Sequence, residues 1–104
     1  MRTNLPIDET LLWDDLMALA ELTEPGRPWT RRAFSPMFLE GRAFVARRMR
    51  EAGLSVRLDT AGNLIGRREG RLAGHKAIVI GSHSDTVPDG GRFDGTAGVM
   101  AGIA

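Results

Sequence analysis

Two stretches in the first half of the chain repeat apolar residues at helical spacing. The segment 8–22 begins with Asp8, which is placed to act as an N-cap. The segment 35–52 begins with Ser35-Pro36, a capping hydroxyl followed by a proline suited to the first helical turn, and ends before Gly53. Each therefore predicts an amphipathic helix. The apolar positions are Leu12, Leu16 and Ala20 in the first and Phe38, Val45, Met49 and Ala52, with Phe44 alongside, in the second.

After Gly53 the apolar residues alternate with polar ones. Residues 54–59 predict a half-buried strand, and 63–68 can return as a second strand after a turn at 60–62. The run 76–81 differs because its centre is continuously apolar, which is typical of a strand buried on both faces of a sheet. A glycine-rich loop follows, and a last helix is expected from Asp94 or Gly95. This order predicts an α/β fold with a central sheet flanked by helices.

Composition restricts the possible functions. The 104 residues are 42% apolar and 26% charged, as in an ordinary globular domain. A net charge of +1 gives no reason to expect nucleic acid or an anionic membrane as a partner. The absence of cysteine excludes disulfides, cysteine-based zinc sites and thiol catalysis, and it fits a reducing, cytoplasmic setting. No apolar run has the length of a transmembrane helix, and residues 1–8 lack the apolar stretch of a signal peptide.

The candidate chemistry lies in residues 81–95, at the carboxyl end of the apolar run, where ligands collect in open α/β sheets. His83 and Asp85 are two residues apart, so in an extended backbone their side chains leave on the same face. Asp85 can then hold one imidazole nitrogen and leave the other for a metal. Asp94 stands where the last helix should begin, and its two oxygens could bridge two ions. Spacing alone also allows a loop histidine bonded to a carboxylate, and Asp94 as an ordinary helix cap.

The donor types favour an open catalytic site over a closed structural one. A closed zinc site needs about four ligands, usually with cysteine, whereas histidine with carboxylates suits Zn²⁺, Mn²⁺ or Co²⁺ in a catalytic site. A nucleotide site is excluded because neither glycine-rich phosphate motif follows the apolar run. The spacing of Gly95, Gly98 and Gly102 instead predicts a smooth helix face packed closely on the sheet. Two further groups are expected in solvent, His75 in a loop and the arginines Arg42, Arg47 and Arg50 on a helix face.

The string GSHSDTVPDGGRFDGTAGV, at residues 81–99, resembles the first metal-binding segment of the M20-type metallohydrolases. Within that group it is similar to the branch of N-carbamoyl-L-amino-acid hydrolases, allantoate amidohydrolases and β-ureidopropionases, which carry G-S-H-x-D-T-V, G-G, F-D-G and G-V. The string TRRAFS at residues 30–35, and residues 52–67, resemble the amino-terminal region of the same branch. The resemblance runs in order from about residue 30 to residue 103.

The resemblance implies a metal-dependent hydrolase that cleaves amide or ureido carbon–nitrogen bonds of small molecules with two divalent ions, Zn²⁺ or Mn²⁺, Co²⁺ or Ni²⁺. It implies that His83 binds one metal, that Asp85 orients His83 and supports catalysis, and that Asp94 bridges both metals. It also implies a cis peptide bond between Asp94 and Gly95. Asp89 falls where the family pattern varies, so we place it at the surface.

The resemblance further implies that residues 1–104 form the amino-terminal portion of a catalytic domain and are inactive alone. The Glu-Glu pair, later histidines, substrate-binding arginine and dimerisation domain of the family would lie farther along, in a homodimeric full-length enzyme. Glu40, Glu51 and Glu69 match none of those motifs. Two alternatives stay open: an M20-type aminoacylase or dipeptidase, which a substrate panel would identify, and a non-catalytic interaction domain, which would bind no divalent ion.

Overall fold

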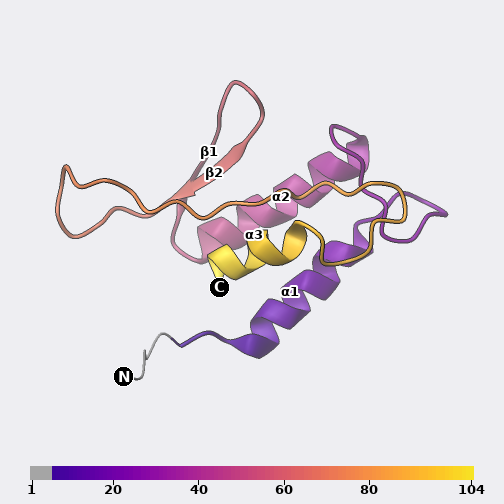
Figure 1. The fold of residues 1–104 in the computed structure, drawn as a ribbon, viewed down its shortest axis with the longest axis horizontal. Helices are drawn as coiled ribbons and strands as arrows, with labels where there is room; N and C mark the ends of the chain where they lie inside the picture. The colour runs from indigo at the N-terminus through magenta and orange to yellow at the C-terminus, as the bar shows by residue number, and fades with distance from the viewer. Residues whose placement is uncertain (1–5) are drawn as a thin grey trace.

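The computed structural model describes residues 6–104 (Figure 1). In this part of the chain helices are combined with a small sheet, which confirms the α/β class. The elements in order are α1 (Glu9–Glu21), α2 (Pro36–Glu51), β1 (Ser55–Leu58), β2 (Leu64–Arg67) and α3 (Thr96–Ile103). None of the helices in residues 6–104 combines the length and apolar character needed to span a membrane.

The first two helices begin at the residues that the capping signals predict. The Asp8 carboxylate accepts a hydrogen bond from the Leu11 N–H at 3.0 Å, which satisfies one free donor at the start of α1. The Ser35 hydroxyl accepts from the Phe38 N–H at 3.2 Å at the start of α2. Gly53 follows α2 with a φ of 87°, the left-handed conformation expected of a residue that ends a helix.

The two predicted strands form an antiparallel hairpin. Ser55 pairs with Arg67 and Leu58 with Leu64. In the turn between them, the Asp59 carboxylate accepts hydrogen bonds from the Ala61 N–H at 3.0 Å and the Asn63 N–H at 2.8 Å. A polar side chain therefore closes the hairpin, as Asx turns do.

The predicted strand at 76–81 is wrong for the described chain. The segment is extended, but the only sheet within residues 6–104 consists of β1 and β2, so 76–81 has no hydrogen-bonded strand beside it. Its apolar side chains lie in solvent, with exposed fractions of 94% for Ile78, 85% for Val79 and 70% for Ile80. In Figure 1 the segment is part of the orange trace that runs past the base of the hairpin toward α3. Within residues 6–104, the expected central sheet is thus represented by the two-stranded hairpin alone.

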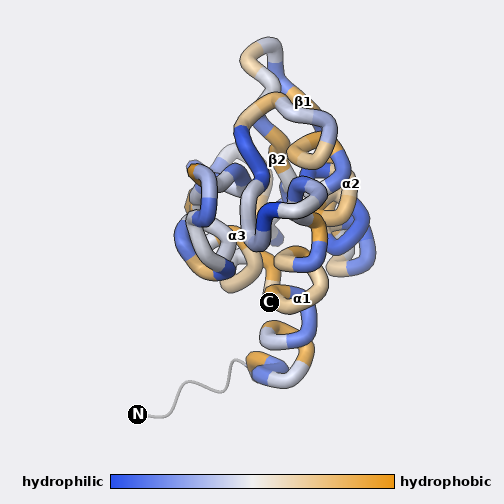
Figure 2. Tube along the Cα trace, turned by 90° about the vertical axis from the view of Figure 1, so that its right-hand side faces the viewer, coloured by the Kyte–Doolittle hydropathy of each residue, from blue (hydrophilic) through white to orange (hydrophobic). Residues whose placement is uncertain are grey.

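The core lies where the three helices meet. Leu16 and Leu19 of α1 pack with Val45 of α2 and Met100 of α3, each at most 8% exposed. Figure 2 shows the hydrophobic positions recurring along α1 and α2 between polar ones. Leu12, Phe44 and Met49 pack at the edge of this cluster, as their spacing predicts. Ala52 is exposed instead of buried because it is the C-cap of α2 and lies beyond the packed face.

Candidate metal site

His83, Asp85 and Asp94 come together, as the sequence predicts. His83 and Asp85 follow the extended segment, and Asp94 lies two residues before the start of α3. The His83 Nε2 atom is 3.6 Å from Asp94 Oδ2, and His83 Nδ1 is 3.3 Å from Asp85 Oδ1. Half of the His83 side chain and most of the Asp94 side chain are exposed, so the pair is open to small molecules.

The surface positions predicted for Asp89 and His75 are confirmed. The Asp89 side chain is exposed and pairs with Arg27, whose Nη2 atom is 3.3 Å from Asp89 Oδ2. His75 is exposed in the loop that precedes the extended segment. Neither residue therefore belongs to the His83 group.

The nearest partner of the imidazole is a backbone atom. His83 Nδ1 lies 2.9 Å from the carbonyl oxygen of Asp85, closer than to the Asp85 carboxylate. Because a carbonyl oxygen can only accept a hydrogen bond, Nδ1 is the protonated nitrogen of the neutral ring. The unprotonated Nε2 then points its lone pair toward Asp94. The sequence predicts the Asp85 carboxylate in this role, whereas its carbonyl has the shorter contact.

The spacing of His83 and Asp94 fits a shared divalent ion. Two ligand atoms bound to one tetrahedral Zn²⁺ at about 2.0–2.2 Å lie about 3.4 Å apart. The observed 3.6 Å between Nε2 and Oδ2 is near that value and is too long for a hydrogen bond. Within residues 6–104, no three side chains of histidine, aspartate or glutamate gather closely enough to hold an ion. Within the described residues, His83 and Asp94 are thus a pair of side chains whose spacing would suit one shared ion.

Gly95 allows His83 and Asp94 to approach each other, a role that the sequence pattern did not single out. It has a φ of 77°, and a Cβ atom there would lie 2.5 Å from the His83 carbonyl oxygen and even closer to the ring atoms Cε1 and Nδ1. It is also the N-cap of α3, without a side-chain hydrogen bond, so the alternative that Asp94 caps this helix is wrong. The expected cis peptide after Asp94 is wrong too, since residues 6–104 contain none.

Gly98 and Gly102 form the closely packed helix face that the sequence predicts, but this face packs against a different segment from the one expected. A Cβ at Gly98 would lie 2.9 Å from the Ser82 Cβ atom, and one at Gly102 would lie 3.1 Å from Ile80 Cγ2. The glycine face therefore packs on the extended segment rather than on a sheet. Because of this contact, the backbone of residues 80–83 runs alongside α3, and His83 lies at the N-terminus of that helix.

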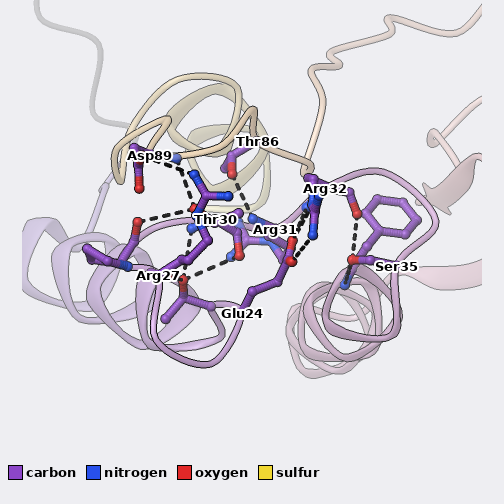
Figure 3. Close-up of polar contacts among 11 residues, drawn as sticks. Glu24, Arg27, Thr30, Arg31, Arg32, Ser35, Thr86 and Asp89 are labelled. Carbon is purple, nitrogen blue, oxygen red and sulfur yellow. Dashed lines mark hydrogen bonds and ion pairs between the residues drawn. The ribbon is translucent and has the colours of Figure 1, made fainter.

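The loop after His83 is fastened to the segment between α1 and α2 (Figure 3). Arg31 and Thr86 exchange two hydrogen bonds of 2.8 Å, one from each backbone N–H. Both residues are buried, with exposed fractions of 3% and 6%. Burial lowers the pKa of the Arg31 guanidinium, and the nearby negative charge of Asp85 opposes that shift. In the sequence Arg31 is marked only by its place in the TRRAFS string.

Comparison with known proteins identifies relatives with defined activities. The chain is 46% identical over 93 residues to an N-carbamoyl-L-amino acid amidohydrolase of Geobacillus stearothermophilus, covering 88% of this chain and 23% of the relative. It is 38% identical over 95 residues to the allantoate amidohydrolase of Escherichia coli, covering 91% and 22%. No family model matches the chain.

A solved structure shares the fold. A hydantoinase/carbamoylase family amidase from Burkholderia ambifaria superimposes with a TM-score of 0.88 at 42% identity, over 95% of this chain and 25% of that one. The chain thus spans about a quarter of the length of the relatives it matches. Over that quarter it resembles the amidases of the hydantoinase/carbamoylase family in both sequence and fold.

Proposed function

We propose that this chain forms part of the metal centre of an amidohydrolase that cleaves the carbon–nitrogen bond of N-carbamoyl amino acids or related ureido compounds. The observation that carries the proposal is the approach of His83 Nε2 to Asp94 Oδ2 at 3.6 Å. The names of the relatives support the substrate class, because one acts on N-carbamoyl-L-amino acids and another on allantoate.

In this proposal His83 and Asp94 hold a divalent ion, Zn²⁺ or Mn²⁺, Co²⁺ or Ni²⁺. The Asp94 side chain is 82% exposed, so its carboxylate would also be accessible to a second ion. Bound divalent ions polarise a substrate carbonyl and make a bound water acidic enough to attack at neutral pH. Asp85 keeps the proton of the His83 ring on Nδ1, so that Nε2 stays available as a ligand.

The 104-residue chain should have no activity by itself. A catalytic zinc site uses about three protein ligands, and the described residues bring together only two candidate ligand side chains. We expect the purified chain to bind less than one equivalent of Zn²⁺ or Co²⁺ and to leave N-carbamoyl amino acids intact.

Activity should return when the chain replaces the matching quarter of a related enzyme. We would splice residues 1–104 into the Geobacillus stearothermophilus amidohydrolase in place of its matching segment. The chimera should hydrolyse an N-carbamoyl-L-amino acid, and His83→Ala or Asp94→Ala should lower its kcat/KM by at least about 100-fold. His75→Gln is the matched control, because His75 is exposed and lies outside the site.

A folded but inactive chimera would contradict the proposal, and so would either of two further results. One is a folded chimera in which His83→Ala and Asp94→Ala retain full activity. The other is turnover of an N-carbamoyl amino acid by the 104-residue chain without the relative. Circular dichroism of each variant separates a lost ligand from a lost fold.

A further inference from the structure

The two peptide groups on either side of Asp85 are both fixed by one residue, Arg31. The guanidinium Nε of Arg31 donates to the Ser84 carbonyl oxygen at 2.9 Å. The Arg31 carbonyl oxygen accepts from the Thr86 N–H at 2.8 Å. The first contact holds the peptide group between residues 84 and 85, and the second holds the one between 85 and 86. Because peptide groups are planar, these contacts fix both backbone dihedral angles of Asp85.

The second of these peptide groups also faces His83. Its N–H belongs to Thr86, and its carbonyl is the Asp85 oxygen that lies 2.9 Å from His83 Nδ1. The N–H and the carbonyl of a trans peptide point in opposite directions. The hydrogen bond that holds the Thr86 N–H against Arg31 therefore directs the Asp85 carbonyl toward the imidazole ring.

Arg31 is itself held firmly in place. Its Nη1 atom donates to the carbonyl oxygens of Leu19 at 3.0 Å and Leu22 at 2.8 Å, at the end of α1 where free carbonyls favour a cation. Gly41 of α2 makes room for the side chain, since a Cβ there would lie 2.6 Å from Arg31 Cδ. The guanidinium thus joins the end of α1 to the loop that carries the site.

Neighbouring residues extend this connection without reaching the imidazole. The Thr30 hydroxyl accepts from the Asp89 N–H at 2.9 Å (Figure 3). The Trp29 carbonyl accepts from the Gly90 N–H at 3.2 Å. These contacts hold the far end of the loop. Of the segment 29–31, Arg31 alone bonds to the two peptide groups that flank Asp85.

We propose that Arg31 is a positioning residue for the metal site: by fixing the backbone on both sides of Asp85, it keeps the His83 proton on Nδ1 and turns Nε2 toward Asp94. This inference rests on the proposed function for its purpose, because it explains how His83 becomes a ligand. It does not require a bound metal to be tested, since the position of the ring proton is a property of the metal-free chain.

The test is a nitrogen NMR spectrum of the histidine rings in the metal-free 104-residue chain, recorded at about pH 8.5, about two units above the pKa of histidine in model peptides. His75 is exposed and serves as the internal reference for an unrestrained ring. We expect a single Nδ1–H form for His83 and a mixture of both forms for His75. Arg31→Met keeps the Arg31 carbonyl but removes the guanidinium bonds to Ser84, Leu19 and Leu22 that hold this carbonyl and the loop in place. The His83 signals should therefore move toward the pattern of His75, with a smaller shift in Arg31→Lys, which keeps the charge but loses the planar fork.

Arg32→Met is the matched control. Arg32 is the next residue in the chain, is exposed, and pairs with Glu24 instead of the loop. Its removal should leave the His83 signals unchanged. A folded Arg31→Met chain that keeps the single Nδ1–H form would overturn the inference and leave Arg31 a packing residue. A His75-like mixture in the unchanged chain would overturn it as well.

If Arg31→Met does not fold, the role of Arg31 can be tested in the unchanged chain by measurements on its Nε–H proton. The Arg31 Nε–H should exchange with solvent at least about tenfold more slowly than the Nε–H of the exposed Arg50. The Arg31 Nε–H should also show a proton–proton NMR contact to Ser84 or Asp85. If this proton exchanges rapidly and shows no such contact, the inference is overturned. If the chimera is inactive but the position of the His83 ring proton still changes in Arg31→Met, only the proposed function is contradicted. If the chimera is active but the His83 ring proton is unaffected by Arg31→Met, only this inference is contradicted.

Discussion

Gly95 shows how a single missing Cβ shapes the candidate site. Its φ of 77° turns the chain between Asp94 and α3, and its bare Cα lets the His83 ring and carbonyl lie directly against the backbone. Any other residue would meet two separate costs. One is the left-handed backbone conformation, and the other is the overlap with His83.

Gly95→Ala should therefore destabilise the chain more than an alanine at another left-handed glycine. Gly91 is the matched control, because its φ is 83° and a Cβ there would meet nothing within 4 Å. We expect Gly91→Ala to lower the free energy of unfolding by about 1 kcal/mol. Gly95→Ala should lower it by at least about 2 kcal/mol more, because the overlap includes a backbone oxygen that rotation of the ring cannot move. Urea unfolding measures both, and equal losses would show that His83 does not lie against Gly95.

At the scale of single residues, the sequence predicts which side chains could bind a metal better than it predicts which residues hold them in position. His83, Asp85 and Asp94 can be selected because their donor atoms are rare and closely spaced, and because the surrounding string resembles a known metal-binding segment. Arg31 could not be selected, since a buried arginine and a solvated one look alike in sequence. Its function depends on Ser84 and Thr86, more than 50 residues away, and only the fold brings them together.

Among the elements, the hairpin depends on the charge of one turn residue. The side-chain amide and backbone N–H of Asn63, followed by the Ala61 N–H, lower the pKa of the Asp59 carboxyl below its usual range. A carboxyl group with a lowered folded-state pKa stabilises the fold at pH values above its unfolded-state pKa of about 3.9. That contribution is lost as the pH falls through the lower, folded-state value.

Asp59→Asn should consequently alter the pH dependence of stability. The variant cannot ionise at this position, so the stability advantage of the unchanged chain should be full at neutral pH and should shrink below about pH 4. Denaturant unfolding at a series of pH values from neutral to acid measures the difference. A difference that is constant across the series would show that the charge of Asp59 does not contribute to the turn.

The elements also differ in how completely their own sequence determines them. The helices α1 and α2 and the hairpin carry caps, turn residues and periodic apolar positions within their own residues, so their limits are predicted to within a few residues. In the run 76–81, the sequence shows only a continuous series of apolar residues, which favours burial. A buried strand needs strands on either side and helices above and below, and no residue in 76–81 specifies whether the described chain supplies them.

The whole molecule is more open than a compact domain of its length. Its radius of gyration is 14.7 Å, compared with about 13 Å for a compact chain of this length. Its accessible surface is 7699 Å², compared with about 5,700 Å² for a compact folded monomer of the same mass. Part of the excess is the extended segment, where Ile78, Val79 and Ile80 form a row of exposed apolar side chains on an unpaired backbone.

An unpaired, apolar and extended segment is a surface on which two chains can associate. We expect the 104-residue chain to self-associate with rising concentration, and the double change Ile78→Glu with Val79→Lys to weaken that association. The two new charges cancel, so the net charge of +1 is kept. Ile80 is left unchanged because it packs against Gly102 of α3.

Sedimentation velocity at increasing concentration measures this association. Both replaced side chains are at least 85% exposed, so the free energy of unfolding should change by less than about 0.5 kcal/mol. Leu72→Gln is the control, since Leu72 is also exposed but lies in the loop before the segment. A chain that stays monomeric at every concentration, or a double variant that associates as strongly as the unchanged chain, would show that the segment does not attract a second copy. Weaker association with unchanged stability would instead locate the contact in 78–79, because no loss of folding could then account for it.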